Sequence, residues 1–149
     1  MKISTKSPWA QKEIEQFLAE AKTPMRLAFN DRDGFPAVCS LWFYFDEGSF
    51  WAASHKTAHM VKMLKQNSKV SVEVATNEYP YKGVRAKANV ELSMDGADNV
   101  LQRLISRYLV DGNNKLADWL LSRVADEYVL KITPRIVNAW DFSNRMDKD

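Results

Sequence analysis

A polar segment at residues 54–64 carries the side chains in this sequence that are best suited to hold an anion. Residues 50–53 before it are apolar and aromatic enough for a buried strand, and Met60, Val61 and Leu64 within it have the spacing of a packed helix face. The polar side chains of the joint are those of Ser54, His55, Lys56, Thr57, His59 and Lys62. Because the start of a helix exposes free backbone N–H groups, the segment predicts a phosphate-binding site.

A purely structural explanation of the same segment stays open at the level of sequence. In that explanation Thr57 only caps the helix, and the basic side chains are solvated surface. A metal site is not expected, because His55 precedes the predicted helix start and no cysteine or carboxylate lies close to the two histidines in sequence.

The composition describes a single globular domain over residues 1–149. Hydrophobic residues make up 46% of the chain and charged residues 27%, with only 5 Gly and 5 Pro, which excludes a disordered or low-complexity protein. A net charge of +2 is too balanced to predict a nucleic-acid or membrane partner. The single cysteine, Cys39, leaves no intrachain disulfide, and neither a signal sequence nor a membrane-spanning apolar run is visible, so we expect a cytoplasmic location.

Hydrophobic periodicity changes along the chain in a way that predicts its elements. Helices are expected at residues 8–22, with Ser7 as the N-cap, and at residues 57–66, 96–110 and 115–123. Strands are expected at residues 24–30, 35–45, 50–53, 69–75, 84–92 and 128–142, the last interrupted at Pro134. The second strand is apolar on both faces and is therefore predicted to be central, whereas residues 1–7 and 144–149 are predicted to be flexible.

The order of these elements favours a barrel. Six strands in meander order, with a helix after the third strand and a helical excursion before the last, predict a mainly β fold, a closed antiparallel β-barrel with helices outside. An open α/β sheet would need alternating strand and helix units, which this order lacks.

Other catalytic patterns are missing from the sequence. The sequence contains neither the GxGxxG motif nor the Walker motif for phosphate binding. Residues 46–49 are expected to form a turn, so Asp46 and Glu47 are not expected to be a catalytic pair of carboxylates. Cys39 lies in an apolar strand, where a buried thiol is unreactive. Aromatic side chains are more numerous than a small core requires: Trp42, Tyr44, Trp51, Tyr79, Tyr81 and Trp140. Most are expected in the core, and Trp140, near the chain end, is the best placed to stack on a planar ligand.

Five segments, taken in order, carry a resemblance to a known family. They are RLAF at residues 26–29, GFPAVCSLWF at 34–43, the segment 54–64 followed by NSKV at 67–70, YKGVR at 81–85, and ITPRIVNAWDF at 132–142. Together they resemble the pyridoxamine 5'-phosphate oxidase-related proteins, the FMN-binding split-barrel family, over roughly residues 8–142. The fold that this implies is a six-stranded antiparallel split β-barrel with flanking helices.

The resemblance implies a homodimer that holds FMN in each of two clefts between the subunits. The flavin ring would lie along the second and third strands, against backbone groups of Val38, Cys39, Ser40 and Leu41. The residues carried over to the phosphate are Ala53, Ser54, Thr57, His59 and Lys62, with Arg85 or Lys87 as a further cation. Trp140 matches an aromatic side chain that closes the site from the other subunit.

The sequence departs from the family pattern at one position. Met60 stands where many members have a lysine, so that Lys62 or Lys56 would have to take its role. The residues that bind the substrate phosphate in a true pyridoxamine phosphate oxidase are not found, and that reaction is not assigned. The expected function is that of an FMN-dependent oxidoreductase acting on a small planar substrate.

Two groups of alternatives keep the barrel and change its use. A deazaflavin or a haem would occupy the same cleft, the haem with His55 or His59 as axial ligand. A non-enzymatic flavin-binding or stress-related protein would use the cleft for storage or sensing. The sequence identifies no electron donor and no catalytic base.

Overall fold

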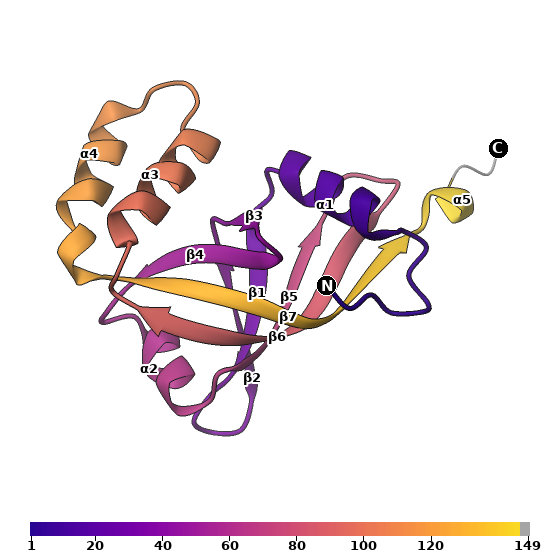
Figure 1. The fold of residues 1–149 in the computed structure, drawn as a ribbon, viewed down its shortest axis with the longest axis horizontal. Coiled ribbons are helices and arrows are strands. Elements are labelled where there is room, and N and C mark those ends of the chain that lie inside the picture. Colours follow the sequence, from indigo (N-terminus) through magenta and orange to yellow (C-terminus); the bar gives the residue numbers. More distant parts are fainter. Residues whose placement is uncertain (147–149) are drawn as a thin grey trace.

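The computed structural model describes residues 1–146 and is organised around one antiparallel sheet of seven strands (Figure 1). The strands are β1 (Met25–Asn30), β2 (Pro36–Leu41), β3 (Tyr44–Asp46), β4 (Ser49–His55), β5 (Lys69–Ala75), β6 (Lys82–Ser93) and β7 (Glu127–Asp141). Their order across the sheet is β2-β1-β5-β6-β7-β4-β3. The predicted mainly β, antiparallel class is confirmed, with one strand more than expected.

The additional strand arises because the predicted strand at residues 35–45 is split. Its two parts, β2 and β3, lie at opposite edges of the sheet and are joined by Trp42 and Phe43. Phe43 is fully buried, and its N–H donates to the Tyr108 hydroxyl at 3.4 Å instead of to a strand. The prediction of a central strand is therefore wrong. The second apolar face of β2 is a surface, on which Val38 is 69% exposed.

The predicted interruption of the last strand is a β-bulge. β7 runs without a break past Pro134, but its register with β6 shifts there, with Lys87 opposite Ile136 and Ala88 opposite Pro134. Proline has no N–H to donate to the ladder, so a bulge allows the strand to continue through it.

The helices lie around the sheet and are α1 (Gln11–Glu20), α2 (His59–Gln66), α3 (Ala97–Tyr108), α4 (Asn114–Ser122), a 3-10 turn at Val124–Asp126, and α5 (Ser143–Met146). Figure 1 shows α3 and α4 side by side at one end of the molecule and α5 at the opposite end. Within residues 1–146, no helix is long and apolar enough to cross a membrane.

The N-terminal segment is held to the sheet. Ile3 forms a parallel bridge with Val137, and the Ser7 hydroxyl accepts the N–H of Ala139 at 3.3 Å. Ser7 therefore does not cap α1 as predicted; the Glu13 carboxylate accepts the Ala10 N–H at 2.8 Å instead. These contacts attach residues 3–7 to β7, and the flexibility of residues 1–7 stays a prediction. At the other end, residues 144–146 belong to α5, and 147–149 lie outside the described residues.

Apolar side chains between the inner face of the sheet, α1 and α2 form the main core. Its largest fully buried members are Phe43, Phe50, Ile14, Leu18, Met25, Leu27, Met63, Leu130 and Ile132. A smaller cluster lies under α3 and contains Tyr44, Ala97, Val100, Leu104 and Val129. Burial of these groups is the main driving force for the fold.

Arg107 connects α3 to the end of α1. Its guanidinium donates to the carbonyls of Leu18 at 2.9 Å and Ala19 at 3.0 Å. The last turn of α1 contains no basic residue, so Arg107 supplies from another helix the positive charge and the donors that a helix C-terminus favours.

Candidate functional site

A pocket of about 390 Å³ lies where the ends of β2 and β4 meet α3 and α4. We call it the α3–α4 pocket. It is lined by Ser40, Leu41, Trp42, Ala53, Ser54, His55, Leu101, Leu104, Leu116, Leu120, Arg123 and Glu127. Four residues predicted from the family resemblance, Ser40, Leu41, Ala53 and Ser54, thus lie around one pocket, although they come from two strands that are not neighbours in the sheet.

The edge position of β2 matters for the groups that it offers. In the described part of the chain β2 pairs only with β1, from Pro36 opposite Asn30 to Leu41 opposite Met25. The N–H and C=O groups on the other side of an edge strand have no ladder partner. Residues 38–41 can therefore present backbone groups to a ligand, which a central strand could not do.

The polar end of the α3–α4 pocket is formed by the pairing of β4 with β7. Their register places His55 opposite Glu127, whose side chain is only 6% exposed. Burial raises the pKa of Glu127, while the nearby charges of Arg123 and His55 oppose this rise. Within residues 1–146, no hydrogen bond to this carboxyl group contributes to the shift in its pKa.

The tautomer of His55 follows from its contacts. Its Nδ1 accepts the backbone N–H of Thr57 at 3.2 Å and lies 2.8 Å from the Thr57 hydroxyl. An accepting Nδ1 carries no proton, so the neutral ring bears its proton on Nε2. His55 is thus a hydrogen-bond donor at the pocket.

The turn between β4 and α2 differs from the structural explanation in which Thr57 caps the helix. α2 begins at His59 with Ala58 as its N-cap, and no side chain caps it. The first N–H groups of α2 therefore remain available to an anion.

Two basic side chains of the segment 54–64, Lys56 and His59, contact carboxylates of the chain itself. Lys56 Nζ lies 2.7 Å from the Asp126 carboxylate, which raises the pKa of Lys56 and lowers that of Asp126. His59 Nε2 lies 2.9 Å from Asp31 in the turn between β1 and β2, and the Arg32 N–H together with His59 lowers the pKa of Asp31. Lys62 is exposed.

Cys39 and Met60 meet beneath β2. The Cys39 Sγ lies 3.2 Å from the Met60 Sδ, and Met60 is only 6% exposed. Burial raises the pKa of the Cys39 thiol, as expected for an unreactive side chain facing the core. The position where the family has a lysine is therefore occupied by a core side chain, and any phosphate contact must come from elsewhere.

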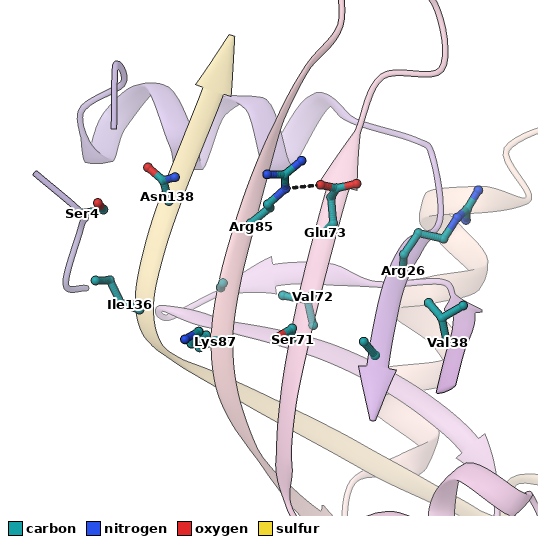
Figure 2. Close-up of a pocket in the computed structure, with 12 residues that line it drawn as sticks. Ser4, Arg26, Val38, Ser71, Val72, Glu73, Arg85, Lys87, Ile136 and Asn138 are labelled. Carbon is teal, nitrogen blue, oxygen red and sulfur yellow. Dashed lines mark hydrogen bonds and ion pairs between the residues drawn. The ribbon is translucent and has the colours of Figure 1, made fainter. Parts of the chain in front are cut away.

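A second cavity, of about 610 Å³, lies on the outer face of the sheet (Figure 2). We call it the outer-face cavity. It is lined by Ser4, Arg26, Ala28, Val38, Ser71, Val72, Glu73, Arg85, Ala86, Lys87, Ile136 and Asn138. It brings together three more predicted residues, Val38, Arg85 and Lys87, and it is positively charged on balance, because Arg26 adds a third cation against the single carboxylate of Glu73.

The polar residues of the outer-face cavity form a row across the strands. The register places Arg26 opposite Glu73, Glu73 opposite Arg85, and Arg85 opposite Asn138, and the Arg85 guanidinium donates to the Glu73 carboxylate (Figure 2). This pair is at the surface, so it orients Arg85 more than it stabilises the fold.

Trp140 lies next to this row. The Arg85 guanidinium is 4.9 Å from the centre of the Trp140 ring, a cation–π contact. Trp140 Nε1 and Asn138 Oδ1 are both buried without a hydrogen-bond partner in the part of the chain that the structure describes. Buried polar groups rarely stay unpaired, so Asn138 and Trp140 are unusual positions beside the outer-face cavity.

Some residues that were predicted for the site line neither pocket, and some residues that line the pockets were not predicted. Thr57, His59 and Lys62 line neither the α3–α4 pocket nor the outer-face cavity. Sequence reasoning missed Arg26, Glu73 and Asn138, whose signal is the polar half of the strand alternation, and it missed Arg123, Glu127, Leu116 and Leu120. Within residues 1–146, no group of three or more His, Cys, Asp or Glu side chains could hold a metal ion.

Comparisons with known proteins agree with this architecture. A family model described as pyridoxamine 5'-phosphate oxidase matches residues 10–141, and the chain belongs to this family. No curated protein matches the sequence.

Solved structures show the same fold at low identity. A conserved hypothetical protein from Mycobacterium tuberculosis has a TM-score of 0.80 at 18% identity, over 100% of this chain and 95% of that one. An F420 reductase has a TM-score of 0.70 at 22% identity, over 83% of this chain and 94% of the other. The haem storage protein HutZ from Vibrio cholerae has a TM-score of 0.65 at 21% identity, over 84% and 89% of the two chains.

Replacing Glu127 with Gln should stabilise the protein at neutral pH. Because burial raises the pKa of Glu127 above its unfolded value, ionisation costs the folded state more than the unfolded state, and stability is lost as the pH rises through this range. We expect Glu127→Gln to raise the melting temperature at about pH 7 and to leave it unchanged below the ordinary pKa of 4.5, where both states are neutral. The exposed Glu91 on β6 provides the control, Glu91→Gln, with no change at either pH. An equal rise at both pH values would assign the effect to shape and not to charge.

Proposed function

We propose that this protein is an FMN-binding oxidoreductase that acts as a homodimer on a small planar substrate. The observation that carries the proposal is the meeting of Ser40 and Leu41 with Ala53 and Ser54 beside the free edge of β2. These are the positions that the family resemblance assigns to the flavin. A reducing compartment such as the cytoplasm suits its free thiol, Cys39.

The residues present suit both ends of FMN, the flavin ring and the phosphate. Free backbone groups of residues 38–41 suit the polar edge of the ring, and Leu41 and Trp42 supply apolar surface. For the phosphate, the uncapped N–H groups at the start of α2 and the exposed cation of Lys62 replace the lysine expected at Met60. When bound, the flavin would supply the electron or hydride transfer, and the chain would bind and orient it.

A second copy of the chain would complete the site. The outer-face cavity carries the exposed Val38, which another chain would cover, and Asn138, whose Oδ1 has no hydrogen-bond partner within residues 1–146. Burial of this face between two copies would bring Arg85 and Trp140 of one copy to the flavin of the other. Arg85 would then act as the additional phosphate cation, held in position by Glu73 and Trp140.

The purified protein is expected to be yellow and to release FMN on denaturation. Its absorption spectrum should be that of a flavin, which distinguishes it from a haem or a deazaflavin, and mass analysis of the released molecule should give FMN. A colourless protein that does not quench FMN fluorescence on titration would refute the proposal.

Bound FMN is expected to be bleached by a nicotinamide donor under anaerobic conditions, since an oxidoreductase must accept electrons from a partner. The measurement is the loss of flavin absorbance after addition of NADH or NADPH. Dithionite serves as the control that the bound flavin is reducible. Bleaching by dithionite together with none by either nicotinamide would favour storage or sensing over catalysis with these donors.

Arg85→Ala and Lys62→Ala should each weaken FMN binding about tenfold, the effect of losing one charge-assisted hydrogen bond. The affinity for riboflavin, which has no phosphate, should fall by less than about twofold, because the contacts with the flavin ring remain. Fluorescence titration with the two flavins measures this difference. Lys65→Ala is the matched control on α2, since Lys65 stands over the Tyr128 ring at 4.8 Å. Equal losses for FMN and riboflavin would contradict the phosphate role.

Val38→Asp should convert the dimer into a monomer, because it places a charge in the face that we propose is buried. Sedimentation velocity at several protein concentrations measures the change. Val110→Asp is the matched control, since Val110 is 78% exposed and follows α3, away from this face. A monomeric parent protein, or the same dissociation in both variants, would argue against an interface at the outer-face cavity.

A further inference from the structure

We propose that the α3–α4 pocket binds, against its helical wall, a small apolar ligand whose polar end is an oxygen acceptor, and that Arg123, His55 and the protonated carboxyl of Glu127 donate hydrogen bonds to it. Binding of this ligand does not depend on the proposed function. Its identification as the substrate does, because it rests on the proposed oxidoreductase activity. The strand side of the pocket is the side assigned to the flavin, whereas these three residues and the helix leucines have no role in that assignment.

The walls of the pocket select an apolar body. Leu101 and Leu104 come from α3, and Leu116 and Leu120 come from α4. Trp42 adds an aromatic face, which is held in place by its stacking on Tyr108, with ring centres 5.1 Å apart. A volume of about 390 Å³ is within the range of small-molecule sites and too small for a protein segment of any length.

The apolar side chains of α4 are only partly covered by the rest of the described chain. No residue of α4 is buried, although it carries Leu116, Trp119, Leu120 and Leu121. Trp119 is 52% exposed and is covered in part by Arg123, whose guanidinium lies 4.4 Å from the ring centre. An amphipathic helix normally buries its apolar stripe, and here Leu116 and Leu120 face the pocket. A ligand in the pocket would complete their burial.

The polar groups at the other end are donors. Arg123 has only donors, and His55 carries its proton on Nε2 because Nδ1 accepts from Thr57. The buried Glu127 carboxyl is neutral over a wider pH range than an exposed one, and a protonated carboxyl donates. The remaining nearby carboxylate, that of Asp126, is paired with Lys56 at 2.7 Å. Arg123 and His55 thus offer donors to one apolar pocket, with Glu127 as a third when its carboxyl is protonated, and such a set suits a carbonyl or carboxylate oxygen.

The test uses two naphthalene probes that differ only in their polar end: 2-naphthoate, with an oxygen acceptor, and 2-naphthylmethylamine, with a cationic donor. Isothermal titration calorimetry of the full chain should detect binding of 2-naphthoate and none of the amine. Arg123→Met should weaken the binding of 2-naphthoate about tenfold, as expected for the loss of one charge-assisted hydrogen bond. Equal binding of the two probes, or no binding of 2-naphthoate, would overturn the proposal.

The location of the ligand is tested on α4 with matched substitutions. Leu120→Trp fills the pocket and should weaken binding of 2-naphthoate at least tenfold, whereas Leu121→Trp, on the same helix and outside the pocket lining, should change it less than about twofold. Leu116→Trp is the second filling variant if Leu120→Trp does not fold, as judged by circular dichroism. Equal effects of substitution at positions 120 and 121 would place the ligand elsewhere and overturn the proposal.

Titrations of the flavin-free and FMN-saturated protein separate this inference from the proposed function. Binding of 2-naphthoate without any FMN binding would confirm the pocket and reject the flavoprotein proposal. FMN binding without any binding of 2-naphthoate, in either form, would reject the pocket alone.

Discussion

The short connection formed by Trp42 and Phe43 is the constraint on which the rest of the structure depends. It joins β2 and β3, the two edges of a seven-stranded sheet, and a three-residue step spans roughly 11 Å at most. The sheet must therefore curl until its edges are close, without a ladder between them. The result is a barrel-like sheet that is not closed, because β2 and β3 do not pair with each other. Its open side exposes the backbone of β2 and places the ends of β2 and β4 around one pocket.

Several basic side chains of the predicted phosphate site contact carboxylates of the chain itself. The cations that first suggested a phosphate site are largely engaged in local pairs, Lys56 with Asp126 and His59 with Asp31, which orient the turns around α2. Exposed pairs of this kind add little to the free energy of unfolding. Of the other predicted phosphate cations, Lys62 is exposed on α2, whereas Arg85 and Lys87 line the outer-face cavity, so the predicted cations are divided between two places on the molecule.

Local patterns predicted the fold where local rules decide it. The strands at residues 24–30 and 69–75 were predicted almost to the residue because alternation and turn residues define them. The split at Phe43 was not predictable, because both halves of that segment are apolar and their separation depends on which distant strands they pair with. In the same way, the family resemblance predicts Ser40 and Ser54 as site residues, but Glu127 lines the same pocket only through the register of β4 with β7, which leaves no local signal.

The contact between Arg107 and the end of α1 has a thermodynamic consequence for the helices over the pocket. It fixes α3 to the body of the protein, whereas α4 contributes no buried residue within the described chain. The cost of ordering α4 would then be part of the free energy of ligand binding, since the pocket needs both helices. Substitutions on the solvent face of α4 that raise its helix propensity would reduce this cost. Affinity could thus be adjusted from a surface that no ligand touches.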